Sequence, residues 1–278
     1  MKTRVKILLR LIFVLMIGCV MGFSGCRNTS GKLTIEVFKK RGKLVVLTEP
    51  YFAPYEYYNK KAEVVGVDMD IAELIAKALG VKVEIRPQMF EGLFSALDVN
   101  EGDIVMAALT LTLTPGRGDH YLYSAPYADA CQKILILEDR NDIKEFKDFS
   151  GKTVGVPAGF TSETCVQEAK EDGRLKGTEI RPFLDVQAVL RALENKCIDA
   201  ALLDSRAADY YAQRDPERLK VLPELIGTEK YAFMYSKNMS QEVISLIDNI
   251  IARIKTDGTL DGFYAKHSPV NADGGGED

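Results

Sequence analysis

Residues 102–117 read GDIVMAALTLTLTPGR, in which leucine and threonine alternate before a proline, a glycine and an arginine. Such alternation is typical of a half-buried β-strand, because successive side chains point to opposite faces of a sheet. We therefore predict a strand over 102–114. A strand needs leucines on its buried face, but it does not need a row of hydroxyls that ends in a cation. The end of this strand, with Arg117, is therefore a candidate binding site.

Apolar runs of strand length and amphipathic stretches of helical period alternate on both sides of this segment, which favours an α/β fold with a largely parallel sheet. The alternating strands and helices form two sets, and no Pro/Ser-rich linker separates them. This arrangement predicts two lobes joined by continuous strands. In the helix predicted over 68–80, Asp70 and Glu73 fit a capping box and Gly80 fits a C-terminal cap. The other predicted strands are 43–47, 81–85, 132–138, 152–159, 178–183, 197–204 and 231–236, and the other helices are 91–98, 143–151, 161–173, 185–196 and 241–258.

The composition excludes several classes of protein. The 278 residues carry a formal net charge of −4, which gives no support to nucleic-acid binding. The two histidines, His120 and His267, are far apart and fit no metal-ligand spacing. Nucleophile-elbow, phosphate-loop and dinucleotide-binding motifs are absent from the sequence. We therefore look for a binding site before an enzyme site.

The N-terminus has the pattern of a secretion signal. A basic stretch leads into eleven apolar or small residues over 11–21, which is too short to span a bilayer. The run ends in FSGC, which resembles the lipobox of bacterial lipoproteins and makes Cys26 the expected lipidation site. Two alternatives are a lipobox that ends at Cys19 and a signal anchor that stays uncleaved. Acyl chains on Cys26 would tether the protein to a membrane without a transmembrane helix.

Three cysteines remain after cleavage at Cys26: Cys131, Cys165 and Cys197. Their odd number and irregular spacing do not form a disulfide framework. A Cys165–Cys197 bridge is an alternative, but small buried thiols are the favoured interpretation.

Several side chains suited to ligand binding follow predicted strands, where ligands bind in open α/β sheets. Arg117 would match a carboxylate with its planar fork of donors, and Asp204 ends the strand 197–204. Glu49 and Phe52 follow the first strand, and Phe90 opens the helix after the next one. An anion-binding arginine, a cation-binding aspartate and aromatic walls would together suit a zwitterion.

The ordered series of these segments resembles the polar amino-acid-binding proteins of bacterial ABC importers, solute-binding protein family 3. The segments that carry the resemblance run from about 42 to 266 and read KLVVLTEPYFAPYEYY, VVGVDMDIAELIAKALG, FEGLFSAL, GDIVMAALTLTLTPGR, YSAPYADACQKILI, GKTVGVPAGFTSE, CIDAALLD and IKTDGTLDGFY. This family implies the α/β periplasmic binding protein-like II fold, in which two lobes joined by two hinge strands close on a ligand. The hinges would lie near Ala130–Gln132 and Thr228–Tyr231. The expected divisions are a lipoprotein signal peptide (1–25), a tether (26–41), a discontinuous first lobe (42–130 and 229–268), a second lobe (131–228) and a disordered tail (269–278).

The resemblance assigns roles to individual positions. Arg117 would bind the ligand α-carboxylate, Asp204 the α-ammonium, and Thr161 would add a hydrogen bond to the carboxylate. Phe160 departs from the small hydroxyl residue that is usual in the family, so apolar contact would replace a polar one there. The remaining assignments are Phe52 as the stacking aromatic, Phe90 as the second wall, Glu49 as a reader of cationic side chains, and Ser162 beside Thr161.

One position in the opening stretch has two assignments. Counting forward from Asp103 makes Thr110 the ligand-binding hydroxyl, whereas counting back from Arg117 makes it Thr112. A two-residue insertion would reconcile the counts and keep every side chain on its face, because the strand period is two. Ala108 is also expected to be a ligand-binding position.

The resemblance implies a monomeric binding protein without a cofactor, lipid-anchored at the outer face of the cytoplasmic membrane or in the periplasm. It would capture a polar or cationic amino acid and deliver it to the permease of an ABC transporter. The alternative is an enzyme similar to cyclohexadienyl or prephenate dehydratase, which would need an added cation in the cleft for its substrate's extra carboxylate.

Overall fold

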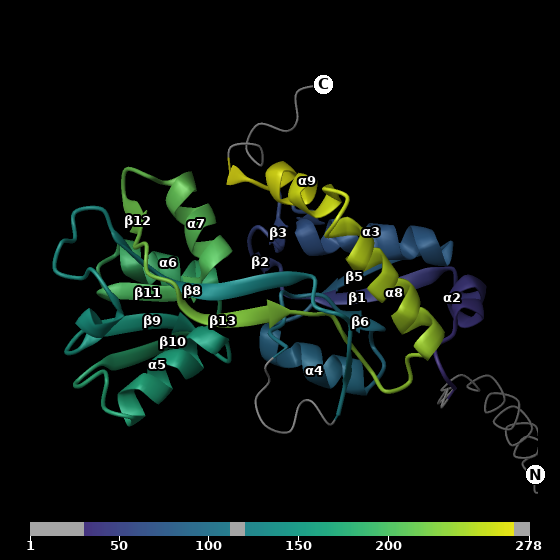
Figure 1. The fold of residues 1–278 in the computed structure, drawn as a ribbon, viewed down its shortest axis with the longest axis horizontal. Helices are drawn as coiled ribbons and strands as arrows, with labels where there is room; N and C mark the ends of the chain where they lie inside the picture. The colour runs from purple at the N-terminus through teal and green to yellow at the C-terminus, as the bar shows by residue number, and fades with distance from the viewer. Residues whose placement is uncertain (1–30, 112–119, 270–278) are drawn as a thin grey trace, which may run out of the picture. The chain divides into compact units, whose positions relative to one another are not determined.

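The computed structural model describes residues 31–111 and 120–269. From Leu33 onward the chain forms one compact unit, which contains two sheet-bearing lobes (Figure 1). The sheet of the first lobe has the strand order β5–β1–β6–β14–β7, with β1 parallel to β5 and β6 and β14 antiparallel to both of its neighbours. These strands are β1 (Lys43–Thr48), β5 (Lys82–Pro87), β6 (Ile104–Val105), β7 (Leu122–Tyr123) and β14 (Met234–Tyr235).

Strand β1 sends alternate side chains into two apolar layers, as a strand between two helical layers must. Leu44 and Val46 are buried with Ile75 of α3 and Ile247 of α8. Leu47 points the other way and is buried with Leu93 of α4. The helices of this lobe are α2 (Ile35–Arg41), α3 (Val67–Leu79), α4 (Phe90–Asp98), α8 (Gln241–Ile254) and α9 (Thr259–Lys266).

A small antiparallel sheet connects β1 to α3 and consists of β2 (Tyr51–Phe52), β3 (Glu56–Tyr58) and β4 (Val64–Val65). Gly66 then lets the chain turn into α3 with a φ of +140°, which favours glycine. A Cβ at Gly66 would collide with the Tyr55 carbonyl. This close approach fixes the start of α3 against the segment that carries Phe52.

The predicted capping box of α3 is wrong, because Gly66 is the N-cap and makes no side-chain capping bond. Asp70 instead accepts a hydrogen bond from Lys266 Nζ at 2.7 Å. The predicted C-terminal cap is confirmed, since Gly80 ends the helix with a φ of +72°.

The second lobe has the strand order β10–β9–β11–β8–β12, and β13 also pairs with β8. β9 is parallel to β10 and β11, and β8 is antiparallel to its partners. Helices cover both faces: Leu202 is buried with Val166 of α5, and Leu203 is buried with Val189 of α6. The elements are β8 (Ala128–Leu137), 3₁₀ helix η2 (Phe146–Phe149), β9 (Thr153–Pro157), α5 (Thr161–Glu171), β10 (Glu179–Phe183), α6 (Val186–Glu194), β11 (Ala200–Asp204), α7 (Ser205–Arg214), β12 (Leu219–Val221) and β13 (Ile226–Tyr231).

The chain passes between the two sheets twice, from β7 into β8 and from β13 into β14 (Figure 1). β8 and β13 pair antiparallel, with Ala128 opposite Tyr231 and Gln132 opposite Ile226. The expected hinge positions lie in these two strands. The β8–β13 pairing places side chains of both strands at the junction of the lobes.

The strand predicted over 102–114 is shorter than expected, because β6 ends at Val105. The Ala108 N–H donates to Asp68 Oδ2 at 3.0 Å, and Ala108 has a φ of +43°, which interrupts the extended backbone. Thr110 returns to the sheet only as an isolated bridge to Tyr231. The remainder of the predicted strand lies outside the described residues.

Candidate functional site

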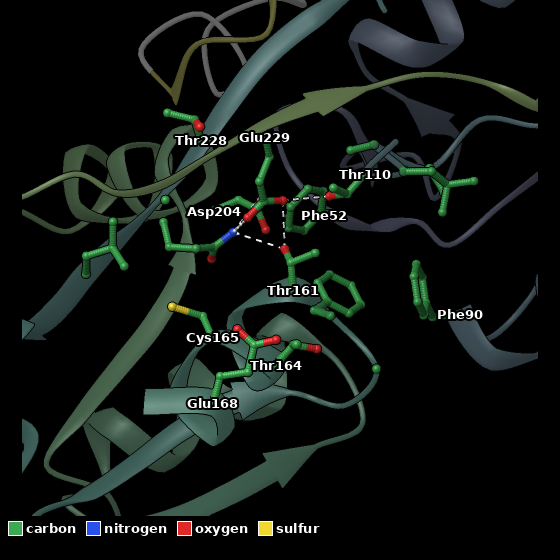
Figure 2. A pocket seen from close by; sticks show the side chains of 18 of the residues that line it. Phe52, Phe90, Thr110, Thr161, Thr164, Cys165, Glu168, Asp204, Thr228 and Glu229 are labelled. Carbon is green, nitrogen blue, oxygen red and sulfur yellow. Dashed lines mark hydrogen bonds between the residues drawn. The ribbon is translucent and has the colours of Figure 1, made fainter. Parts of the chain in front are cut away.

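A cavity of about 430 Å³ opens between the two lobes. Side chains from both sheets and from the two joining strands line it (Figure 2). The lining residues are Phe52, Phe90, Phe94, Ala107, Ala108, Leu109, Thr110, Tyr123, Gln132, Gly159, Phe160, Thr161, Thr164, Cys165, Glu168, Arg174, Asp204, Ile226, Gly227, Thr228, Glu229 and Met234.

Three phenylalanines from separate elements form an aromatic wall of this cavity. Phe160 precedes α5 in the second lobe, and its ring lies 5.5 Å from that of Phe52 in β2 and 4.6 Å from that of Phe90 in α4, measured between centroids. The contacts are edge-on or tilted, as aromatic pairs prefer. Phe160 therefore joins two first-lobe phenylalanines in an apolar part of the cavity wall.

Asp204 ends β11 and is buried in the cavity wall. It accepts hydrogen bonds from the Tyr231 hydroxyl and from Gln132 Nε2, the latter at 3.3 Å. Burial raises the pKa of Asp204 well above its usual value, and the nearby Glu229 carboxylate adds to the increase. A positively charged group in the cavity would oppose the effects of burial and of Glu229, and so would lower the pKa of Asp204.

Glu229, on β13, lies at the centre of the polar part of the cavity (Figure 2). Its Oε2 accepts from the hydroxyls of Thr110 at 2.6 Å and Thr161 at 2.8 Å. Its Oε1 accepts from Gln132 Nε2 at 2.9 Å. Thr110 belongs to the first lobe and Thr161 starts α5 in the second, so this one carboxylate bridges the two lobes.

Six of the residues expected from the sequence come together around this cavity: Phe52, Phe90, Ala108, Thr110, Thr161 and Asp204. Glu49 and Ser162 are buried but are not among its lining residues. Cys26, Thr112 and Arg117 lie outside the described residues, so the choice between Thr110 and Thr112 stays open even though Thr110 faces the cavity.

Sequence reasoning missed Gln132 and Glu229, because both lie in strands to which we assigned only a hinge role. The signal that could have identified them is that each joining strand carries a polar residue where the lobes meet. It also missed Thr164, Cys165 and Glu168, which follow the expected Thr161 at helical spacing on the face of α5 that lines the cavity.

The described cysteines are free thiols, so no Cys165–Cys197 bridge forms. The expectation of buried thiols is wrong for Cys197, which is exposed, and Cys131 and Cys165 are only partly buried. In the described part of the chain, no helix is long and apolar enough to cross a membrane.

Three buried acids of the first lobe, Glu49, Glu56 and Asp68, lie near one another but do not line the cavity. Burial raises the pKa of Glu49 to about 8, with a further contribution from Asp185. Burial also raises the pKa of Asp68 to about 6, although the nearby Tyr127 hydroxyl and the hydrogen bond from the Ala108 N–H oppose it. The pKa of Glu56 lies well above its usual value, first because of burial and then because of Asp68. Asp68 is the acid that holds Ala108 in the cavity wall.

Solved structures with this fold include a *Streptococcus pneumoniae* amino acid ABC transporter substrate-binding protein bound to L-arginine, 26% identical, with a TM-score of 0.76 over 85% of this chain and 98% of that chain. An ancestral amino acid-binding protein, described as a precursor of cyclohexadienyl dehydratase, is 33% identical, with a TM-score of 0.75 over 85% of this chain and 100% of that chain. The fold and the cavity between its lobes thus define a two-lobed solute-binding protein.

The chain belongs to the bacterial extracellular solute-binding proteins, family 3, whose sequence profile matches residues 44–269. A relative named as a probable histidine-binding protein of *Campylobacter jejuni* is 27% identical over 224 residues, which is 81% of this chain and 84% of that protein. The expected two-lobed periplasmic binding protein fold is confirmed.

The raised pKa of Glu49 predicts a pH-dependent stability. At pH values between 4.5, the usual pKa of a glutamate, and about 8, Glu49 holds a proton in the folded protein but has released it in the unfolded chain. Glu49 therefore makes the protein less stable as the pH rises through this range. The free energy of unfolding of the wild type should therefore fall relative to that of Glu49→Gln between pH 5 and 8, by on the order of 4 kcal/mol. Urea denaturation at several pH values measures this difference.

Glu73→Gln, at an exposed position of α3, is the matched control and should run parallel to the wild type. A Glu49→Gln curve that also runs parallel to the wild type would contradict the assigned shift.

Proposed function

We propose that this protein captures a polar or cationic amino acid outside the cytoplasmic membrane and delivers it to an ABC permease. The observation that carries the proposal is the cavity between the lobes, to which the first lobe contributes Phe52 and Thr110 and the second contributes Thr161 and Asp204. A ligand that contacts both sets would hold the lobes together, as in hinge closure around a ligand. The family membership and the named relatives support the same ligand class.

The polar groups of the cavity suit the two charges of an amino acid. Asp204 would accept from the α-ammonium, and the hydroxyls of Thr110 and Thr161 would donate to the α-carboxylate, together with Arg117. Gln132 Oε1 is buried and without a hydrogen-bond partner in the described part of the chain, so a donor such as an ammonium group would satisfy it. Phe52 would contact the aliphatic part of the ligand.

The size and charge of the cavity favour a ligand with an extended or cationic side chain. A volume of about 430 Å³ lies within the usual range for small-molecule sites and leaves room beyond an amino acid's backbone atoms. Asp204 and Glu229 lie close enough to raise the pKa of Asp204, so the site gains from added positive charge. We keep Glu49 as a candidate for recognising the ligand's side chain, although it is buried and does not line the cavity.

The ancestral neighbour described as a precursor of cyclohexadienyl dehydratase keeps an enzyme of that type as the second candidate. Its substrate class carries an additional carboxylate, for which Arg174 in the cavity lining is the added cation expected of such an enzyme. Asp204 and Glu229 would repel that carboxylate in the same cavity. Turnover of prephenate by the purified protein would favour the enzyme over the binding protein.

We further propose that the protein is held at the membrane by acyl chains on Cys26, because an apolar run and a lipobox-like FSGC precede this position. Cys26→Ser should move the protein, expressed in a bacterium, from the detergent phase to the aqueous phase of a Triton X-114 extract. Cys131→Ser is the matched control and should leave the protein in the detergent phase. Equal partitioning of Cys26→Ser and the wild type would contradict lipidation at Cys26.

The ligand proposal predicts stabilisation by an amino acid. In a thermal-shift screen of the twenty amino acids, ornithine and cystine, at least one should raise the melting temperature, because a ligand at 100 times its Kd adds about 2.7 kcal/mol. Asp204→Asn should lower the affinity of that ligand by roughly tenfold or more, since it removes a charged hydrogen-bond acceptor worth about 1.5–3 kcal/mol. Isothermal titration calorimetry measures the affinity.

Asp209→Asn is the control, because Asp209 pairs with Lys133 and does not line the cavity. Its affinity should match that of the wild type. The absence of any stabilising amino acid would contradict the proposed function.

A further inference from the structure

Glu229 already places a carboxylate on the hydroxyls that the proposed function gives to the ligand. Its Oε2 accepts from Thr110 at 2.6 Å and from Thr161 at 2.8 Å, both within the range of strong O–H···O bonds. Gln132 holds its other oxygen at 2.9 Å. One carboxylate is therefore bound by three donors from three separate elements.

The hydroxyls cannot serve two carboxylates at once. Each threonine hydroxyl has a single proton to donate, and both protons are directed at Glu229 Oε2. A ligand carboxylate that takes the same donors must displace Glu229, because two anionic oxygens brought together without a shared donor repel each other.

We propose that Glu229 is an internal stand-in for the ligand carboxylate, which occupies the Thr110–Thr161 subsite until a carboxylate-bearing ligand displaces it. This inference rests on the proposed function for the identity of the ligand. Glu229 thereby sets a threshold for binding: only a ligand that carries its own carboxylate can replace the bonds to both hydroxyls.

The position of Glu229 in the fold supports this role. It lies on β13, which pairs with β8 and leads toward the first sheet, and it contacts a threonine of each lobe. The Glu229 side chain thus makes the bridge between the lobes that the ligand would make on binding. The three groups that bond it are neutral, so a ligand bringing its own ammonium to Asp204 has an advantage that Glu229 lacks.

Removing the internal carboxylate should favour the ligand. We expect Glu229→Ala to bind the amino acid identified by the screen roughly tenfold more tightly than the wild type, because the competing hydrogen bonds to a charged group are removed. The decarboxylated analogue of the same ligand, which does not use the two hydroxyls, should bind Glu229→Ala no more tightly than the wild type. Glu73→Ala, at an exposed position, is the control. Titration calorimetry measures the affinities of both ligands for the three proteins.

Weaker binding of both the amino acid and its decarboxylated analogue to Glu229→Ala would overturn the proposal, because Glu229 would then be a group that holds the ligand's positive charge. Unchanged affinity for both ligands would overturn it equally.

A second measurement does not depend on the amino acid. Acetate at tens of millimolar should raise the melting temperature of Glu229→Ala but not that of the wild type, with chloride at the same ionic strength as the reference. Glu229→Ala/Thr161→Val should lose this response, because one of the two hydroxyl donors is gone. Acetate that stabilises neither protein, or both equally, would contradict the proposal. An acetate response without any amino-acid ligand would instead count against the proposed function alone.

Discussion

The antiparallel pairing of β8 with β13 joins the two sheets and brings Gln132 and Glu229 to the junction of the lobes. Because these strands run from one lobe toward the other, their polar side chains reach donors and acceptors on both sides. Gln132 Nε2 lies within hydrogen-bond distance of both Asp204 and Glu229. The chain connection and the binding cavity thus use the same two strands, so movement of the lobes and occupation of the cavity are physically linked.

The distribution of acids around the cavity explains which ligands suit it. Asp204 lies in its wall, and burial together with Glu229 raises the pKa of Asp204. Asp68 acts indirectly, since it holds the Ala108 N–H and so shapes the backbone before Thr110. An amino acid that carries its ammonium to Asp204 reduces the cost of the buried charge. A second positive charge on the ligand would reduce this cost further.

The regular parts of the fold could be predicted from the sequence because local patterns determine them. The predicted strand 43–47 and helix 68–80 agree with β1 and α3 to within one residue at either end. The leucine–threonine alternation within 102–114 led to a strand prediction that is too long. The backbone turns away at Ala108, whose contact with Asp68 joins residues forty positions apart. No local pattern reports such a contact, and the same is true of the site. Asp204 was found from the end of its strand and Thr161 from the family resemblance, whereas Glu229 needed the β8–β13 pairing.

The most direct test of this account is a crystal structure of the protein with the amino acid that binds most tightly. The account predicts that the ligand carboxylate lies within hydrogen-bond distance of both the Thr110 and Thr161 hydroxyls, that its ammonium contacts Asp204, and that Glu229 Oε2 has left those hydroxyls. A ligand bound outside the cavity, or bound inside it while Glu229 keeps both threonines, would contradict the account.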